Sequence, residues 1–136
     1  MWSSPVTPTG TAPPTGTPTA TPDLRDAYEP DDVTPHPIAI GETQQHNFFP
    51  TGDIDKVNFA VKSQRYYQAL TSDLALGVDT VVTVSLGGNT LGSNDDYAPG
   101  TGNFASAVCL QSPQDDSAVA TIINKAGFYG PDKTYK

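Results

Sequence analysis

Acidic side chains concentrate in a short segment and in a Gly-Asp-x-Asp loop, and together they form a candidate cation-binding set. The residues are Glu29, Asp31, Asp32, Asp53 and Asp55. Calcium takes about six to eight oxygen ligands, so a site needs several carboxylates that converge from separate loops. Five carboxylates close together would repel one another without a cation, which would make binding and local folding one event. The alternative is that they are solvated turn residues, and their spacing alone leaves both interpretations open.

A second, weaker acidic set follows later in the chain. It comprises Asp79, Asn94, Asp95 and Asp96. Asp79 precedes a predicted strand and the other three close a nearby one, so their side chains could meet at one end of the domain. Hydrogen bonding in Asx turns explains this pattern equally well, and we leave both hypotheses open.

The overall charge excludes several classes of partner. The 136 residues include 15 acidic and 7 basic side chains, which gives a net charge of −8. Nucleic-acid binding needs clustered Lys and Arg, and anionic lipid surfaces attract the same residues, so we expect neither partner. No apolar run approaches the roughly 18 residues of a membrane span, so we expect no membrane insertion.

Catalysis has little support in the sequence, and we expect a protein that is not an enzyme. His36 lies between two prolines, which predicts an exposed turn, and His46 is expected to cap a strand face. The single Cys109 follows Val108 in an apolar strand and is predicted to be a small buried residue. No catalytic residues and no organic cofactor are therefore assigned.

Short apolar/polar alternations separated by Gly, Pro, Asn and Asp predict an all-β fold. No stretch shows helical periodicity over ten residues. Seven or eight short strands in about 110 residues are typical of an antiparallel β-sandwich or a jelly-roll-like fold. The predicted strands cover residues 37–41, 43–49, 56–61, 66–71, 80–86, 105–110 and 118–123.

The N-terminal residues 1–25 are predicted to be a Thr/Pro-rich linker or stalk. Residues 1–22 contain seven Thr and six Pro and no charged side chain. Such a composition cannot bury enough apolar surface to fold and is typical of extracellular, often O-glycosylated stalks. Residues 1–22 are therefore candidates for O-linked glycans, although no signal peptide is visible. The alternative is that residues 1–25 pack on a neighbouring copy and mediate self-association.

The order of motifs resembles the bacterial pre-peptidase C-terminal domain family, whose relatives include the collagen-binding domains of clostridial collagenases. The motifs are DAYEPDD at 26–32, PIAIGETQQHNFFPTGDIDKVNF at 37–59, YYQALTSDLALGVDTVVTV at 66–84 and LGSNDD at 91–96. Each motif alone is weak, whereas their order and spacing together are fairly specific. The resemblance covers residues 26–136, and it implies a small antiparallel β-sandwich appended to secreted or surface proteins, without chemistry of its own.

The resemblance also implies a calcium site where the N-terminal acidic segment meets the Gly-Asp-x-Asp loop. By position this assigns the metal to Glu29, Asp31 and Asp32 on one side and to Asp53 and Asp55 on the other. Two departures from the family pattern matter. Lys56 stands where members usually have an aromatic residue, and GFYGPDKTYK stops at the start of the expected last strand, so that strand is predicted to be incomplete.

The predicted function is a non-catalytic, calcium-stabilised β-sandwich module for attachment or positioning at the cell surface. Several aromatic residues could form an exposed platform for a polysaccharide or protein ligand, but the favoured interpretation is that Tyr67 is a core residue and Tyr97 lies in an ordinary exposed loop. The alternative is a structural subunit of an extracellular fibre or surface assembly, in which the Thr/Pro segment complements a neighbouring copy. The aromatic residues are Tyr66, Tyr67, Tyr97, Phe104, Phe128, Tyr129 and Tyr135.

Overall fold

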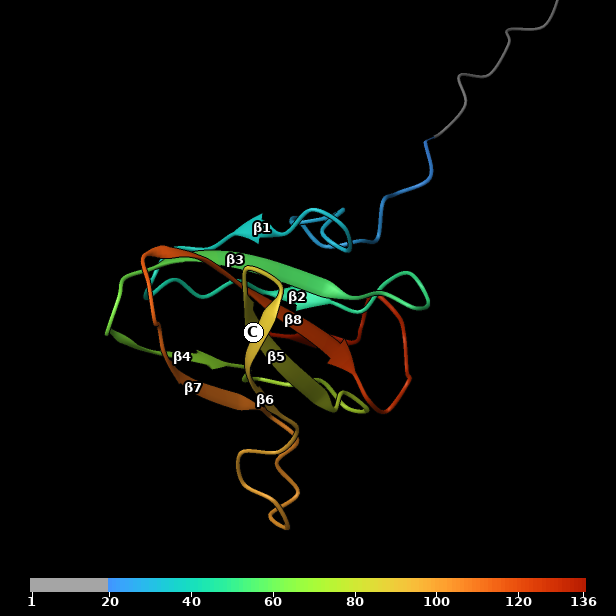
Figure 1. Cartoon of the computed structure of the whole chain (residues 1–136). Helices are drawn as coiled ribbons and strands as arrows, with labels where there is room; N and C mark the ends of the chain where they lie inside the picture. The colour runs from blue at the N-terminus through green and yellow to red at the C-terminus, as the bar shows by residue number, and fades with distance from the viewer. Residues whose placement is uncertain (1–19) are drawn as a thin grey trace, which may run out of the picture.

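Three long strands with alternating apolar residues form the centre of the domain. They are β3 (Asp55–Val61), β5 (Thr80–Leu86) and β8 (Asp116–Asn124), in which buried and less buried residues alternate. Because successive side chains of a strand point to opposite faces, this alternation puts one face of each strand in the core. A computed structural model describes residues 20–136, and these contain strands and no helix (Figure 1). The all-β prediction is therefore confirmed.

The central strands belong to one five-stranded sheet with the order β1-β3-β8-β5-β6. The short β1 (His36–Pro37) pairs parallel with β3, and β6 (Asn89–Asn94) pairs antiparallel with β5. The prediction of a wholly antiparallel fold is thus wrong at β1. The core on the inner face contains Phe48, Val57, Phe59, Val61, Val78, Val82, Val84, Leu86, Val108, Leu110, Ala118, Ala120, Ile122 and Tyr135.

Two short sheets lie against this core, an arrangement that fits a β-sandwich. One pairs β2 (His46–Asn47) with β9 (Thr134–Tyr135), and the other pairs β4 (Tyr66–Leu70) with β7 (Ala107–Gln111). In Figure 1, β4 and β7 form a layer below β3. Just past β9, Lys136 exchanges two backbone hydrogen bonds with Ser72, at 2.7 and 2.8 Å. The end of the chain therefore links the two short sheets.

Several sequence predictions need correction. Residues 37–41 and 43–49 are mostly loop, and the strands there shrink to β1 and β2. The strand β6 was absent from the predicted set because NTLGSN carries little apolar patterning. Cys109 is exposed, since the alternation in β7 turns Val108 and Leu110 inward and Cys109 outward. His36 is half-buried in β1, with its ring 4.9 Å from that of Tyr28.

The predicted Thr/Pro linker falls almost wholly on residues 1–19, which lie outside the described residues. The predictions of O-linked glycans and of packing on a neighbouring copy fall on the same segment and stay predictions. In the described part of the chain, no helix has the length and hydropathy of a membrane span.

Candidate metal centre

Hydrogen bonds between side chains and backbone groups dock the acidic N-terminal segment onto β2 and the start of β3. The Asp26 carboxylate accepts a hydrogen bond from the amide of Asn47 in β2, at 2.8 Å. The Asp32 carboxylate accepts one from the amide of Ile54, at 3.0 Å, and the Lys56 ammonium donates to the backbone oxygen of Asp32. Lys56 therefore holds the acidic segment against the Gly-Asp-x-Asp loop without pairing with a carboxylate.

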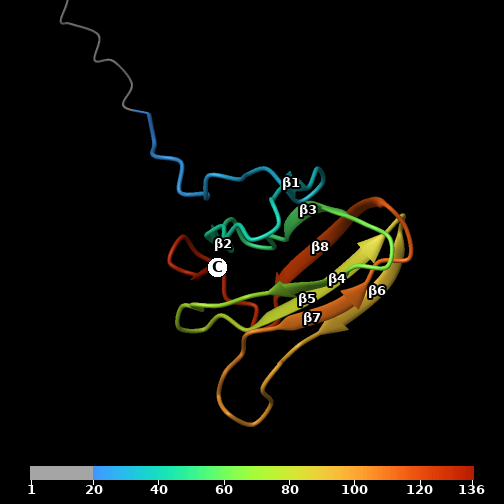
Figure 2. The ribbon, with the colours of Figure 1, turned by 90° about the vertical axis from the view of Figure 1, so that its left-hand side faces the viewer.

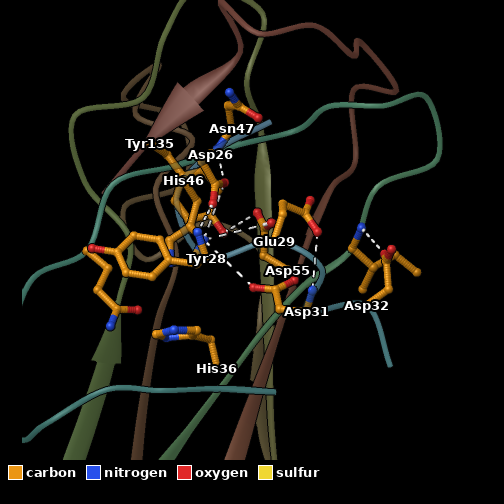
Figure 3. Close-up of polar contacts among 12 residues, drawn as sticks. Asp26, Tyr28, Glu29, Asp31, Asp32, His36, His46, Asn47, Asp55 and Tyr135 are labelled. Carbon is orange, nitrogen blue, oxygen red and sulfur yellow. Dashed lines mark hydrogen bonds and ion pairs between the residues drawn. The ribbon is translucent and has the colours of Figure 1, made fainter. Parts of the chain in front are cut away.

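This docking brings together all five carboxylates of the first predicted set. Figure 3 shows Glu29, Asp31, Asp32 and Asp55 among them. One oxygen each of Glu29, Asp32 and Asp53 lie within 4.8 Å of one another, and the same holds for Glu29, Asp31 and Asp55. Glu29 belongs to both groups, so the carboxylates form one continuous acidic centre. The structure therefore brings the two separate segments together at one place, as the sequence predicts.

Most of this centre is buried. The exposed fraction is 0% for Asp31 and Asp55 and 3% for Asp53. Both carboxylate oxygens of Asp31 and of Asp53, with one oxygen each of Glu29 and Asp55, accept no hydrogen bond from residues 20–136. Buried polar atoms in proteins are nearly always hydrogen-bonded or bound to an ion, because each unsatisfied one costs free energy. Six such oxygens in one place could hold a cation.

Burial and mutual repulsion disfavour the charged forms of these carboxylates. Burial, the largest cause, and nearby Glu29 together raise the pKa of Asp31 and of Asp53 to about 7. Burial raises the pKa of Asp55 to about 9, against a lowering effect of the hydrogen bond from Tyr135. Without a cation, these groups hold protons near neutral pH. A bound cation would replace the protons and allow the carboxylates to ionise.

Three residues of the centre were not predicted as part of it. His46 and Tyr135 reach it from β2 and β9, and Asp26 is the first residue of the motif DAYEPDD but was not assigned to the metal (Figure 3). The Tyr135 hydroxyl donates a 2.5 Å hydrogen bond to Asp55 and is fully buried. One sequence signal could have found His46, since it alternates with the apolar Phe48 and therefore faces inward.

His46 lies within reach of several carboxylates at the inner end of the centre. Its Nδ1 is 3.6 Å from an oxygen of Asp26 and 3.9 Å from oxygens of Asp31 and Asp55. Burial lowers the pKa of His46, which keeps the imidazole neutral near pH 7, although Asp26 acts in the opposite direction. A neutral imidazole therefore does not offset the negative charge of these acids when they ionise.

The second predicted acidic set is assembled in part. Oxygens of Asp79, Asp95 and Asp96 lie within 4.8 Å of one another, but all three side chains are only half-buried. The Lys125 ammonium pairs with Asp95, and the Asn94 side-chain oxygen accepts a 3.0 Å hydrogen bond from the amide of Ala107. This set therefore has a counter-charge of its own, and Asn94 is already used to join β6 to β7.

Searches of family models, curated proteins and solved structures found no match to this chain. The resemblance to the pre-peptidase C-terminal domain family stays a prediction.

The types of ligand atom in the acidic centre determine which ions it could bind. The centre presents closely spaced and mostly buried carboxylate oxygens, which suit a hard divalent cation that takes oxygen ligands.

Proposed function

We propose that the chain is a non-catalytic, extracellular β-sandwich module, stabilised by calcium, that attaches or positions a larger assembly at the cell surface. The observation that carries the calcium role is the set of buried carboxylate oxygens in the centre formed by Glu29, Asp31, Asp32, Asp53 and Asp55. Because these residues come from two segments joined at the start of β3, a cation among them would tie the N-terminal segment to the sandwich.

Calcium is the cation that the donor set fits best. The five predicted ligands are all carboxylates, and calcium accepts many oxygen ligands in an irregular arrangement. Magnesium prefers a near-ideal octahedral shell and keeps several of its waters, whereas this centre offers carboxylate oxygens from five residues. The extracellular location is supported by the Thr/Pro composition of residues 1–22, which is typical of surface stalks.

Thermal unfolding with and without calcium tests this role. We expect the melting temperature at pH 7.5 to rise by about 10 °C in calcium at 100 times its Kd, because binding adds about 2.7 kcal/mol to the free energy of unfolding. Circular dichroism of the full chain, in calcium and in EGTA, measures the shift. Equal melting temperatures in the two buffers would remove calcium from the proposal.

A structural subunit of a surface assembly is the second candidate function. The observation that favours it is the outer edge of β4, which no strand of residues 20–136 covers. Such edges pair readily with other chains. Light scattering after size exclusion separates the candidates. The attachment module predicts the 14.3 kDa mass of a monomer at all concentrations, and the fibre subunit predicts a mass that rises with concentration.

A further inference from the structure

The inner end of the acidic centre differs from the rest because it presents a nitrogen atom. One ligand atom from each of Asp26, His46 and Asp55 lies within 4.8 Å of the other two. These three residues, called the inner site below, come from the N-terminal segment, from β2 and from the start of β3. The three elements lie on the same side of the domain (Figure 2). The inner site shares only Asp55 with the carboxylates proposed for calcium.

The Nδ1 atom of His46 faces acidic oxygens and bonds to none of them. The His46 side chain is 5% exposed, and Nδ1 has no hydrogen-bond partner among residues 20–136. It lies 3.6 Å from an oxygen of Asp26 and 3.9 Å from an oxygen of Asp55, whereas a hydrogen bond would hold the atoms about 2.7–3.2 Å apart. Two ligands of one tetrahedral zinc ion, each about 2.0–2.2 Å from the metal, lie about 3.3–3.6 Å apart. The observed spacing is therefore closer to that of atoms that share an ion.

Contacts from outside the inner site fix the orientation of all three side chains. The backbone amide of Asn47, the residue after His46, donates to the Asp26 carboxylate at 2.8 Å. The Tyr135 hydroxyl donates to Oδ2 of Asp55 at 2.5 Å, while Oδ1 is the oxygen closer to His46. The His46 ring stacks on that of Tyr135, with the ring centroids 5.7 Å apart. Metal ligands in proteins are commonly oriented by such outer partners, so the inner site is organised as a ligand set.

The nitrogen donor changes which cation the inner site suits. Imidazole is a ligand of zinc and other transition-metal ions, whereas calcium and magnesium take oxygen ligands. The carboxylates of Asp26 and Asp55 are 8% and 0% exposed, and together they carry two negative charges when ionised. A divalent ion held by both carboxylates and a neutral imidazole would give the inner site no net charge. Such neutrality is favoured where the ligands are buried.

We propose that Asp26, His46 and Asp55 form a separate site for a transition-metal dication of the zinc class, beside the oxygen ligands proposed for calcium. The two sites meet at Asp55, while Glu29, Asp32 and Asp53 form a cluster of their own. The inference goes beyond the calcium role and does not depend on it, because Asp26 and His46 lie outside the calcium set. A zinc ion here would tie the N-terminal segment to both β2 and β3.

NMR of the two histidine rings during a titration with zinc chloride tests this proposal. The full chain is used at pH 7.5, in calcium-free buffer and again in millimolar calcium. We expect the Nδ1 resonance of His46 to shift and to saturate at one zinc ion per chain in both buffers. His36, the other histidine of the chain, is the internal control, because its Nδ1 lies 3.1 Å from the carbonyl oxygen of Pro37. Its ring resonances should stay unchanged.

Substitutions separate the proposed ligands from other groups that bind zinc. We expect His46→Gln and Asp26→Asn each to weaken zinc binding by about 100-fold or more, since changes to outer partners alone cost about 10–100-fold. Asp115→Asn at an exposed carboxylate and Cys109→Ser at the exposed thiol should bind zinc as the unsubstituted chain does. Isothermal titration measures the affinities. Cooperative thermal unfolding shows that each variant is folded, and an Asn at position 26 still offers an oxygen to the amide of Asn47.

Three results would overturn the proposal. An unshifted His46 ring at millimolar zinc would show that Nδ1 is not a ligand. Equal zinc affinity of the folded His46→Gln variant would place the ion on other residues. Loss of zinc binding in millimolar calcium would show that one ion occupies the whole centre. The calcium role fails separately, since zinc binding at His46 without any calcium-dependent melting shift would remove calcium and leave the inner site in place.

Discussion

Replacing Asp31 and Asp55 together by Asn is expected to abolish the calcium-dependent rise in melting temperature. Each substitution removes a carboxylate from a fully buried position, and Asn preserves its shape. In EGTA the double variant should melt at or above the temperature of the unsubstituted chain, because two mutually repelling buried acids are gone. In calcium it should melt about 10 °C below the unsubstituted chain, since binding no longer adds about 2.7 kcal/mol.

The matched control neutralises two exposed acids that each pair with a lysine. Asp115 pairs with Lys62 and Asp132 pairs with Lys133, and the Asp side chains are 61% and 72% exposed. Exposed pairs contribute about 0–1 kcal/mol, so the Asp115→Asn/Asp132→Asn variant should keep the full calcium shift. The cation role would be contradicted if Asp31→Asn/Asp55→Asn melted below the unsubstituted chain by the same amount in calcium and in EGTA. Asp31 and Asp55 would then have a purely structural role.

The stability of the calcium-free chain is expected to fall as the pH rises from 5 to 9. The folded-state pKa is about 7 for Asp31 and Asp53 and about 9 for Asp55. These values exceed the pKa of about 3.9 in an unfolded chain, so the folded state binds more protons across this range. The stabilisation is complete below pH 4 and is lost as the pH passes through 7 to 9, by on the order of a few kcal/mol.

Calcium should reverse this pH dependence, because only the ionised carboxylates bind the cation and binding releases their protons. The calcium-induced gain in stability should therefore increase from pH 5 to pH 9. Urea unfolding at several pH values, in calcium-free buffer and in saturating calcium, measures both trends. A calcium-free stability that rises with pH over this range would show that the buried acids are not the dominant titrating groups.

Local patterning was sufficient to predict the strands that carry the core. The prediction for residues 80–86 matches β5 in both bounds, and that for 56–61 misses β3 by one residue. In both segments every second residue is apolar, so the period-two pattern and the buried face coincide. The loops around β1 and β2 contain similar apolar residues, but their conformation depends on packing against β3 and β9, which the local pattern does not encode.

The candidate site was predictable as a set of acids and not as a three-dimensional centre. The five carboxylates lie in short motifs, whereas His46 and Tyr135 reach the centre through the pairing of β2 with β9, which joins residues almost ninety positions apart. The burial of Asp55 depends on the same pairing, because Tyr135 covers it. Charge composition could also not separate this centre from the second acidic set, which the ammonium of Lys125 partly neutralises.

Isothermal titration of calcium into the full chain at pH 7.5 measures cation binding itself. We expect saturable binding with the release of protons, detected as a dependence of the measured heat on the ionisation enthalpy of the buffer. The Asp31→Asn/Asp55→Asn variant should give no such binding, while the Asp115→Asn/Asp132→Asn variant should bind as the unsubstituted chain does. Absence of binding to the folded chain at millimolar calcium would contradict the calcium role of the acidic centre.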